Sequence, residues 1–227
     1  MLLNLISFFR LRTRIVIYMN LSILVSLLLT ASRVIVTGRW SFSRLSWNLL
    51  LAYIPFLLSL LFLKLATRAN LRRWAIPFFI LWFLFLPNTF YLLTDMVHLG
   101  EGRGGNYWYD FVLLLSYAIN GTALGVMSIR NMEIGLNASG LLQVRWYFSI
   151  PVLFLASMGV MIGRVLRYNS WSIVLHLDDL LRDLTAVTTD PEKAVVFWGY
   201  TSLCFLVLVS GYWITGRVIV ATRQKSG

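Results

Sequence analysis

The sequence predicts an all-α membrane protein, a bundle of about six transmembrane helices with a short interfacial amphipathic helix before the last span. Three observations predict this fold class. Hydrophobic residues make up 59% of the 227-residue chain and charged residues 13%, and the mean hydropathy is +0.76. The apolar residues form blocks long enough to cross the hydrocarbon core of a bilayer. The basic residues lie between these blocks rather than in one cluster.

Each span approaches or exceeds the roughly 17 to 25 apolar residues that cross a bilayer as a helix. The six segments are about 15–36, 46–66, 74–95, 108–129, 144–166 and 194–216. The first follows a basic stretch and resembles the head of a signal peptide, so a cleaved signal is the alternative. Its apolar stretch is too long for a signal and five further spans follow, which favours a retained helix.

The connections are short except for residues 167–193, and no linker or internal repeat is visible. We therefore expect a single integral-membrane domain over residues 1–227. Within the long connection, leucines recur at helical spacing at Leu177, Leu180 and Leu184, which predicts an amphipathic helix on the membrane surface. Asp190 as N-cap and Pro191 at the first helical position then begin the last span.

The orientation follows from the count of Lys and Arg in alternate connections, because cytoplasmic loops carry the excess. One side has twelve: Arg10, Arg12, Arg14, Lys64, Arg68, Arg72, Arg73, Arg130, Arg145, Arg217, Arg223 and Lys225. The other side has eight: Arg33, Arg39, Arg44, Arg103, Arg164, Arg167, Arg182 and Lys193. This asymmetry predicts that both termini are cytoplasmic.

Composition also excludes some classes of function. The net charge of +11 could indicate nucleic acid, but no motif that reads RNA or DNA gathers the basic residues, so we expect no nucleic-acid partner. The single cysteine, Cys204, excludes an internal disulfide and a cysteine-based metal cage. Its position inside an apolar run predicts a small buried hydrophobe.

The most informative segment is PNTFYLLTDMVH, residues 87–98, at the end of the third hydrophobic run. At roughly 100° per residue, its polar side chains lie within about 120° of one another on a helix. These residues are Asn88, Tyr91, Thr94, Asp95 and His98. One polar face on a helix otherwise suited to lipid predicts a surface turned toward other helices or a wet cavity.

Two further polar clusters are expected at the same membrane face, because the spans alternate in direction. One is Trp108, Tyr109 and Asp110 at the start of the fourth span; the other is Arg164, Arg167, Asn169, Ser170 and Trp171 at the end of the fifth. A buried carboxylate without a partner costs several kcal/mol. We therefore predict that Asp95 or Asp110 pairs with Arg164 or Arg167.

These residues define a candidate site. His98 and Asp95 form a candidate acid/base pair, since a histidine titrates near neutrality and a carboxylate can orient it. The candidate ligand-binding residues are Arg164, Arg167, Asn88, Tyr91, Asp110 and Asn169. Asp95, His98 and Asp110 could also hold a metal, but no metal-binding or cofactor-binding motif is present, so we assign neither a metal nor a cofactor.

Two GxxxG pairs lie within the predicted spans: Gly121 and Gly125 in the fourth, and Gly159 and Gly163 in the fifth. Small residues at this spacing let helices approach closely, so we interpret both pairs as packing surfaces rather than binding sites.

The three polar clusters in this order resemble an uncharacterised bacterial family of multi-pass membrane proteins, domain of unknown function 1361. The resemblance covers the third to the fifth span. It implies a bacterial plasma (inner) membrane protein but brings no established activity. One departure is Ser172, which stands where the family pattern has a carboxylate after Trp171.

Three functions remain open. The first is a membrane enzyme or binding site at the extracytoplasmic face for an anionic or lipid-linked ligand. The second is a non-enzymatic scaffold or assembly factor whose polar network holds the helices together. The third is a transporter for a small solute, which would need polar residues across the bilayer, and Asn120 is one of few deep candidates. The lipid bilayer is the one partner that the composition itself predicts, and the sequence identifies no protein partner.

Overall fold

The computed structural model describes the chain except residues 1, 39, 41, 69–72, 100–105, 141–142, 145, 169–174 and 226–227, and it describes side chains from residue 13 to 217 except residue 14. The described part is helical. The helices are α1 (Leu2–Thr37), α2 (Ser43–Ala66), α3 (Ala75–Thr94), α4 (Tyr107–Ser139), α5 (Trp146–Met161), α7 (Leu177–Thr189) and α8 (Pro191–Lys225). A 3₁₀ turn, Asp95–His98, extends α3, and a π-helical turn, Ile162–Leu166, extends α5.

Six of these helices are long and apolar enough to cross a membrane, which confirms the predicted fold class. The main difference is at α4, which continues to Ser139, beyond the predicted end at residue 129. Its last turns contain Asn131 and Glu133, which lie beyond the predicted end of this span, and both side chains are buried against other helices. Polar residues therefore do not end this helix.

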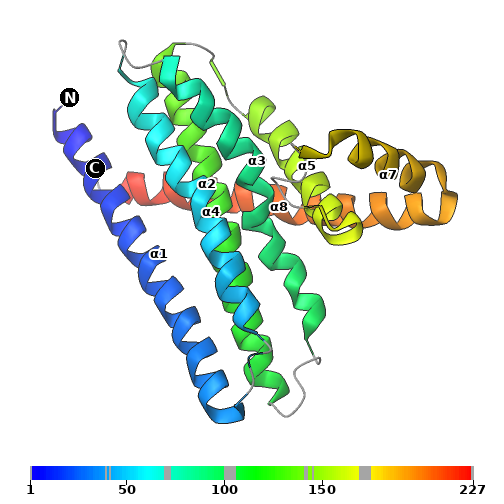
Figure 1. The fold of residues 1–227 in the computed structure, drawn as a ribbon. Helices are drawn as coiled ribbons and strands as arrows, with labels where there is room; N and C mark the ends of the chain where they lie inside the picture. Colours follow the sequence, from blue (N-terminus) through cyan, green and yellow to red (C-terminus); the bar gives the residue numbers. More distant parts are fainter. Residues whose placement is uncertain are drawn as a thin grey trace.

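Figure 1 shows the helices α2, α3 and α4 side by side in the centre, with α1 along one side and α5 next to α3. In the same view, α8 runs across the other helices rather than along them, and it packs mainly on α5. One hydrophobic core lies among α2, α3, α4, α5 and α8. A second lies where α1, α2 and α4 meet.

The helix α3 is held between α4 and α5 by the two predicted glycine pairs. A Cβ atom on Gly125 would lie 2.5 Å from the ring of Phe90, and one on Gly121 would overlap the backbone oxygen of Thr89. On the other side, a Cβ atom on Gly159 would lie 2.6 Å from the ring of Pro87. Glycine is therefore required where these helices touch, and the contacts fix the segment of α3 that leads into the polar face.

The predicted amphipathic helix is α7, which packs alongside α8 (Figure 1). Leu180 is buried and contacts a small core that includes Phe197 of α8. Asp190 caps α8 as predicted, since its Oδ1 atom accepts from the backbone nitrogen of Glu192 at 3.2 Å. The side chain of Lys193 also bonds to this carboxylate and lowers the pKa of Asp190.

A buried polar cluster joins α4, α5 and α8. The carboxylate of Glu133 accepts hydrogen bonds from Ser149 and Tyr212, and Arg130 donates to it at 3.0 Å. The guanidinium of Arg130 also lies 3.7 Å from the centre of the Tyr212 ring. This cluster fixes the point where α8 crosses α4. Cys204, also on α8, is buried as predicted.

Candidate functional site

The centre of the polar face is Asp95, the first residue of the 3₁₀ turn after α3. Its side chain is 4% exposed. One carboxylate oxygen accepts from Nη2 of Arg164 at 2.9 Å, and the other accepts from the side-chain amide of Asn48 at 3.1 Å. The buried charge is thus paired by α5 and hydrogen-bonded by α2, which is the condition for keeping a carboxylate ionised away from water.

The side chain of Arg164 comes from the π-helical turn at the end of α5. The extra residue in such a turn changes the direction of the following side chains, and such turns are frequent at functional sites. Nη2 of Arg164 also donates to Thr94 at 2.9 Å, and its guanidinium lies 4.6 Å from the centre of the Tyr91 ring. These contacts, all with the end of α3 and its 3₁₀ turn, hold the guanidinium in one orientation.

His98 lies one turn beyond Asp95 and is more accessible, with 34% of its side chain exposed. Its Nε2 atom is 3.3 Å from Nη1 of Arg164 and 4.0 Å from Oδ1 of Asp95. Because a guanidinium only donates hydrogen bonds, Nε2 is the acceptor in the first contact. This assigns the ring proton of a neutral His98 to Nδ1.

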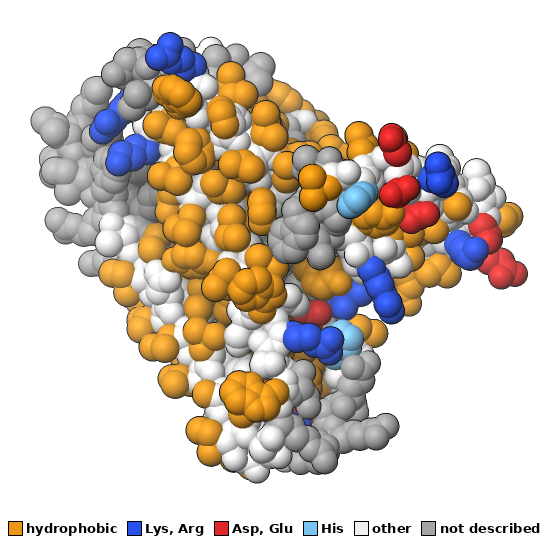
Figure 2. Space-filling view, viewed as in Figure 1, with side chains coloured by type: hydrophobic (Ala, Val, Ile, Leu, Met, Phe, Trp, Pro, Cys, Tyr) orange, Lys and Arg blue, Asp and Glu red, His pale blue; other side chains and the backbone are white. Residues whose placement is uncertain are grey.

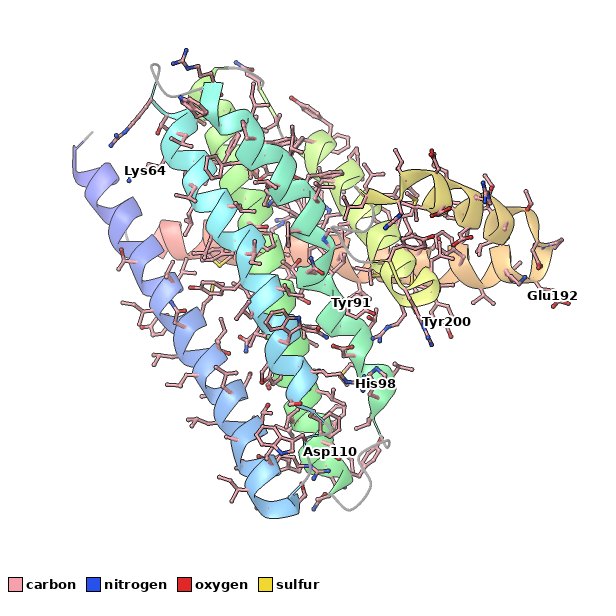
Figure 3. The ribbon with its side chains drawn as sticks, viewed as in Figure 1. Lys64, Tyr91, His98, Asp110, Glu192 and Tyr200 are labelled. Carbon is pink, nitrogen blue, oxygen red and sulfur yellow. The ribbon has the colours of Figure 1, made fainter. Side chains whose placement is uncertain are left out.

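A cavity of about 500 Å³ opens beside this cluster, between α2, α3, α4 and the π-helical turn. Its walls combine charged, polar and aromatic side chains: Phe42, Arg44, Leu45, Trp47, Asn48, Tyr91, Asp95, His98, Leu114 and Arg164. Figure 3 shows Tyr91 and His98 along the last part of α3, with Asp110 farther toward the end of the bundle. In Figure 2, basic, acidic and histidine side chains meet in a small patch on a largely hydrophobic face.

The predicted ion pair between the third and fifth spans is present as Asp95 and Arg164. The other candidate carboxylate, Asp110, is not in the cavity. It pairs instead with Arg33 of α1, at 2.6 Å between Nε and Oδ1, and both side chains are buried. Arg33 was assigned to a connection in the orientation count, but it lies in the last turns of α1 and faces α4.

Two further predicted site residues, Arg167 and Asn88, are not among the residues that line the cavity. Arg167 is exposed and has a left-handed backbone with φ of 60°, and no ion pair of Arg167 is found among the described residues. The side-chain amide of Asn88 donates to the backbone oxygen of Phe85, one turn earlier on α3. Asn169, with Ser170 and Trp171, lies outside the described residues.

Sequence reasoning missed two polar residues of the cavity, Arg44 and Asn48, which lie in the first turns of α2. Arg44 was counted only as a charge in a connection. A signal was present in the spacing, because Arg44 and Asn48 are four residues apart and so share one face of a helix. That this face is turned toward Asp95 depends on how α2 packs against α3, and no local pattern in the sequence indicates that packing.

The cavity suits an anion better than a metal ion. In the part of the chain that the structure describes, no three His, Cys, Asp or Glu side chains come close enough to hold a metal. Asp95 and His98 are neighbours, but the carboxylate of Asp110 belongs to the pair with Arg33. Two guanidinium groups line the cavity, and guanidinium is the group that binds phosphate and carboxylate most specifically.

The fold and the composition define an α-helical, multi-pass membrane protein with a polar cluster at the end of its third helix. The sequence profile of a protein family described as "Protein of unknown function (DUF1361)" matches residues 47–209. The chain therefore belongs to this family. The match includes Asn48, Asp95 and Arg164 of the cavity but begins after Phe42, Arg44 and Leu45. No curated protein and no solved structure matches the chain.

Proposed function

We propose that this protein binds an anionic ligand in the cavity beside Asp95 and Arg164, at the extracytoplasmic face of a bacterial plasma membrane. The observation that carries the proposal is the pair of arginines, Arg44 and Arg164, on the walls of one cavity. The count of basic residues supports cytoplasmic termini, which would place this end of α3 outside.

The two arginines have different roles in this proposal. Arg164 is held by Asp95 and Thr94, so its guanidinium is already oriented before a ligand arrives. Such preorganisation reduces the entropy lost on binding. Arg44 is exposed, and among the described residues it forms no ion pair, so its charge is available to a ligand.

His98 is the residue of the site that could transfer a proton in an enzymatic reaction. It is the imidazole among the described residues that line the cavity, and an imidazole nitrogen can accept or donate a proton. An enzyme acting on the bound anion would use His98 to give or take a proton, with Arg164 orienting its ring. Asp95 serves Arg164 more directly, because its carboxylate is 2.9 Å from Nη2 of Arg164 and 4.0 Å from Nε2 of His98.

The test is thermal unfolding of the detergent-solubilised protein with inorganic phosphate, compared with chloride at equal ionic strength. We expect phosphate to raise the Tm of the wild type, because a ligand that binds only the folded state stabilises it. Arg44→Gln should remove this increase and leave the Tm without phosphate unchanged, since Arg44 is exposed and unpaired among the described residues.

The matched control is Arg68→Gln, which removes an exposed arginine after the far end of α2. This variant should keep the full phosphate effect. Equal Tm values in phosphate and chloride for the wild type would contradict the proposal, and so would an equal loss of the effect in both variants.

A further inference from the structure

We infer that the ligand is a lipid with a singly charged phosphodiester headgroup, whose headgroup enters the cavity while its acyl chains lie along the exposed face of α2. This inference rests on the proposed function, since it names the class of anion that the same cavity binds. Three observations support it: the charge of the cavity, its size, and an apolar stripe that starts at its wall.

The net charge of the described side chains that line the cavity complements a ligand with one negative charge. Among the described residues, the charged lining of the cavity consists of Arg44, Arg164 and Asp95. One arginine charge is balanced by the carboxylate of Asp95, with which it forms an ion pair at 2.9 Å. The two guanidinium groups and the one carboxylate therefore sum to the charge of one guanidinium. A phosphodiester carries one negative charge and complements it, whereas a phosphomonoester dianion would exceed it.

The size of the cavity limits what can enter it. A volume of about 500 Å³ is within the range of sites that hold one small molecule. The headgroup of a phospholipid fits this range, but two acyl chains cannot share the cavity with it. The chains must therefore lie on the adjoining surface of the protein, in the hydrocarbon of the bilayer.

The adjoining surface of α2 is suited to these chains. Trp47, which lines the cavity, is 59% exposed, and exposed leucines follow it on the same helical face: Leu50, Leu57 and Leu61. The stripe runs from the cavity toward Lys64, at the opposite end of α2 in Figure 3. The other face of α2 is buried in the core, for example at Leu49 and Phe56.

Trp47 stands where the headgroup and the chains of such a lipid would join. Tryptophan is favoured at this level of a bilayer because its ring is apolar and its N–H group is polar. Arg44 lies one turn before Trp47 on α2, on the side of the headgroup. Along α2, Arg44 would thus contact the charged headgroup, Trp47 the junction between headgroup and chains, and the exposed leucines the acyl chains.

The experiment measures lipid binding by native mass spectrometry of the detergent-solubilised protein. Phosphatidylglycerol is the phosphodiester lipid with one net negative charge, and phosphatidic acid is the phosphomonoester. Phosphatidylcholine is the control without net charge, because its choline cation offsets its phosphodiester, and deacylated phosphatidylglycerol is the headgroup alone. We expect phosphatidylglycerol to bind at least about tenfold more tightly than the other three. Leu50→Asn with Leu57→Asn should weaken its binding about tenfold, because two apolar contacts with the chains are lost.

The same double variant should still be stabilised by inorganic phosphate, which shows that it folds and keeps the anion site. The control Leu24→Asn changes an exposed leucine on α1 and should leave lipid binding unchanged. The inference is overturned if the deacylated headgroup, phosphatidic acid or phosphatidylcholine binds as tightly as phosphatidylglycerol. An equal effect of Leu24→Asn also overturns it. If phosphate raises the Tm of the wild type but phosphatidylglycerol does not bind, this inference alone is refuted. If phosphate does not raise the Tm and phosphatidylglycerol does not bind, the proposed function is refuted as well.

Discussion

Arg164→Gln will lower the free energy of unfolding by about 3 kcal/mol, because removal of one partner leaves the other buried charge uncompensated. The charge left behind is Asp95, whose side chain is 4% exposed and which still accepts a hydrogen bond from the amide of Asn48. The same substitution will abolish stabilisation by phosphate, since the fixed guanidinium of the cavity is gone. The measurement is denaturant unfolding in detergent, with and without phosphate.

A second substitution separates these two effects. In Asp95→Asn with Arg164→Gln, no buried charge is left, so most of the lost stability should return while phosphate binding stays absent. Arg167→Gln is the matched control, because Arg167 is an exposed arginine three residues later, outside the cavity lining. If Arg164→Gln is as stable as Arg167→Gln, the buried ion pair does not stabilise the fold. If the double variant still responds to phosphate, Arg164 does not bind the anion.

Gly121→Ala will lower the free energy of unfolding by about 2 to 3 kcal/mol, the cost of overpacking a tight contact. The added Cβ atom would overlap the backbone oxygen of Thr89, and a backbone atom in the middle of α3 cannot move as a side chain can. The helices α3 and α4 would have to separate, which displaces the segment that leads to Asp95. We therefore expect phosphate stabilisation to fall with the Tm.

Gly199→Ala provides the comparison for this prediction. Gly199 is also a helical glycine, on α8, but a Cβ atom there would meet nothing within 4 Å. Alanine is the better helix former, so this variant should be as stable as the wild type or slightly more stable. Equal stabilities of Gly121→Ala and Gly199→Ala would show that α3 and α4 do not pack through this glycine.

Local patterns in the sequence were sufficient for the fold class and for the ion pair at the end of α3. A span is defined by its own composition, and the polar face of α3 is defined by the period of one helix. The pairing of Asp95 with Arg164 followed from the cost of an unpaired buried carboxylate and from alternating topology, and it is confirmed. The glycine pairs were also correctly interpreted as packing surfaces, since both contact α3.

The partners that were missed depend on the relative position of whole helices. Arg33 and Asp110 are far apart in the sequence, and nothing in either segment indicates that α1 packs against α4 at this level. Glu133 lies between the predicted fourth and fifth spans, outside any predicted helix. Its carboxylate is instead satisfied by Arg130, Ser149 and Tyr212, the last from α8, whose course across the bundle the sequence does not indicate.

The central claim is that the cluster at His98 faces a water-filled, anion-selective cavity on the extracytoplasmic side. The most direct test is His98→Cys with Cys204→Ser, treated in intact cells with membrane-impermeant thiosulfonates of either charge. Cys204 is the single cysteine of the chain, so its replacement by serine leaves the new thiol at position 98 as the one that can react. We predict that the anionic reagent modifies it about tenfold faster than the cationic reagent, because Arg44 and Arg164 attract it. No modification, or a faster reaction with the cationic reagent, would contradict the account.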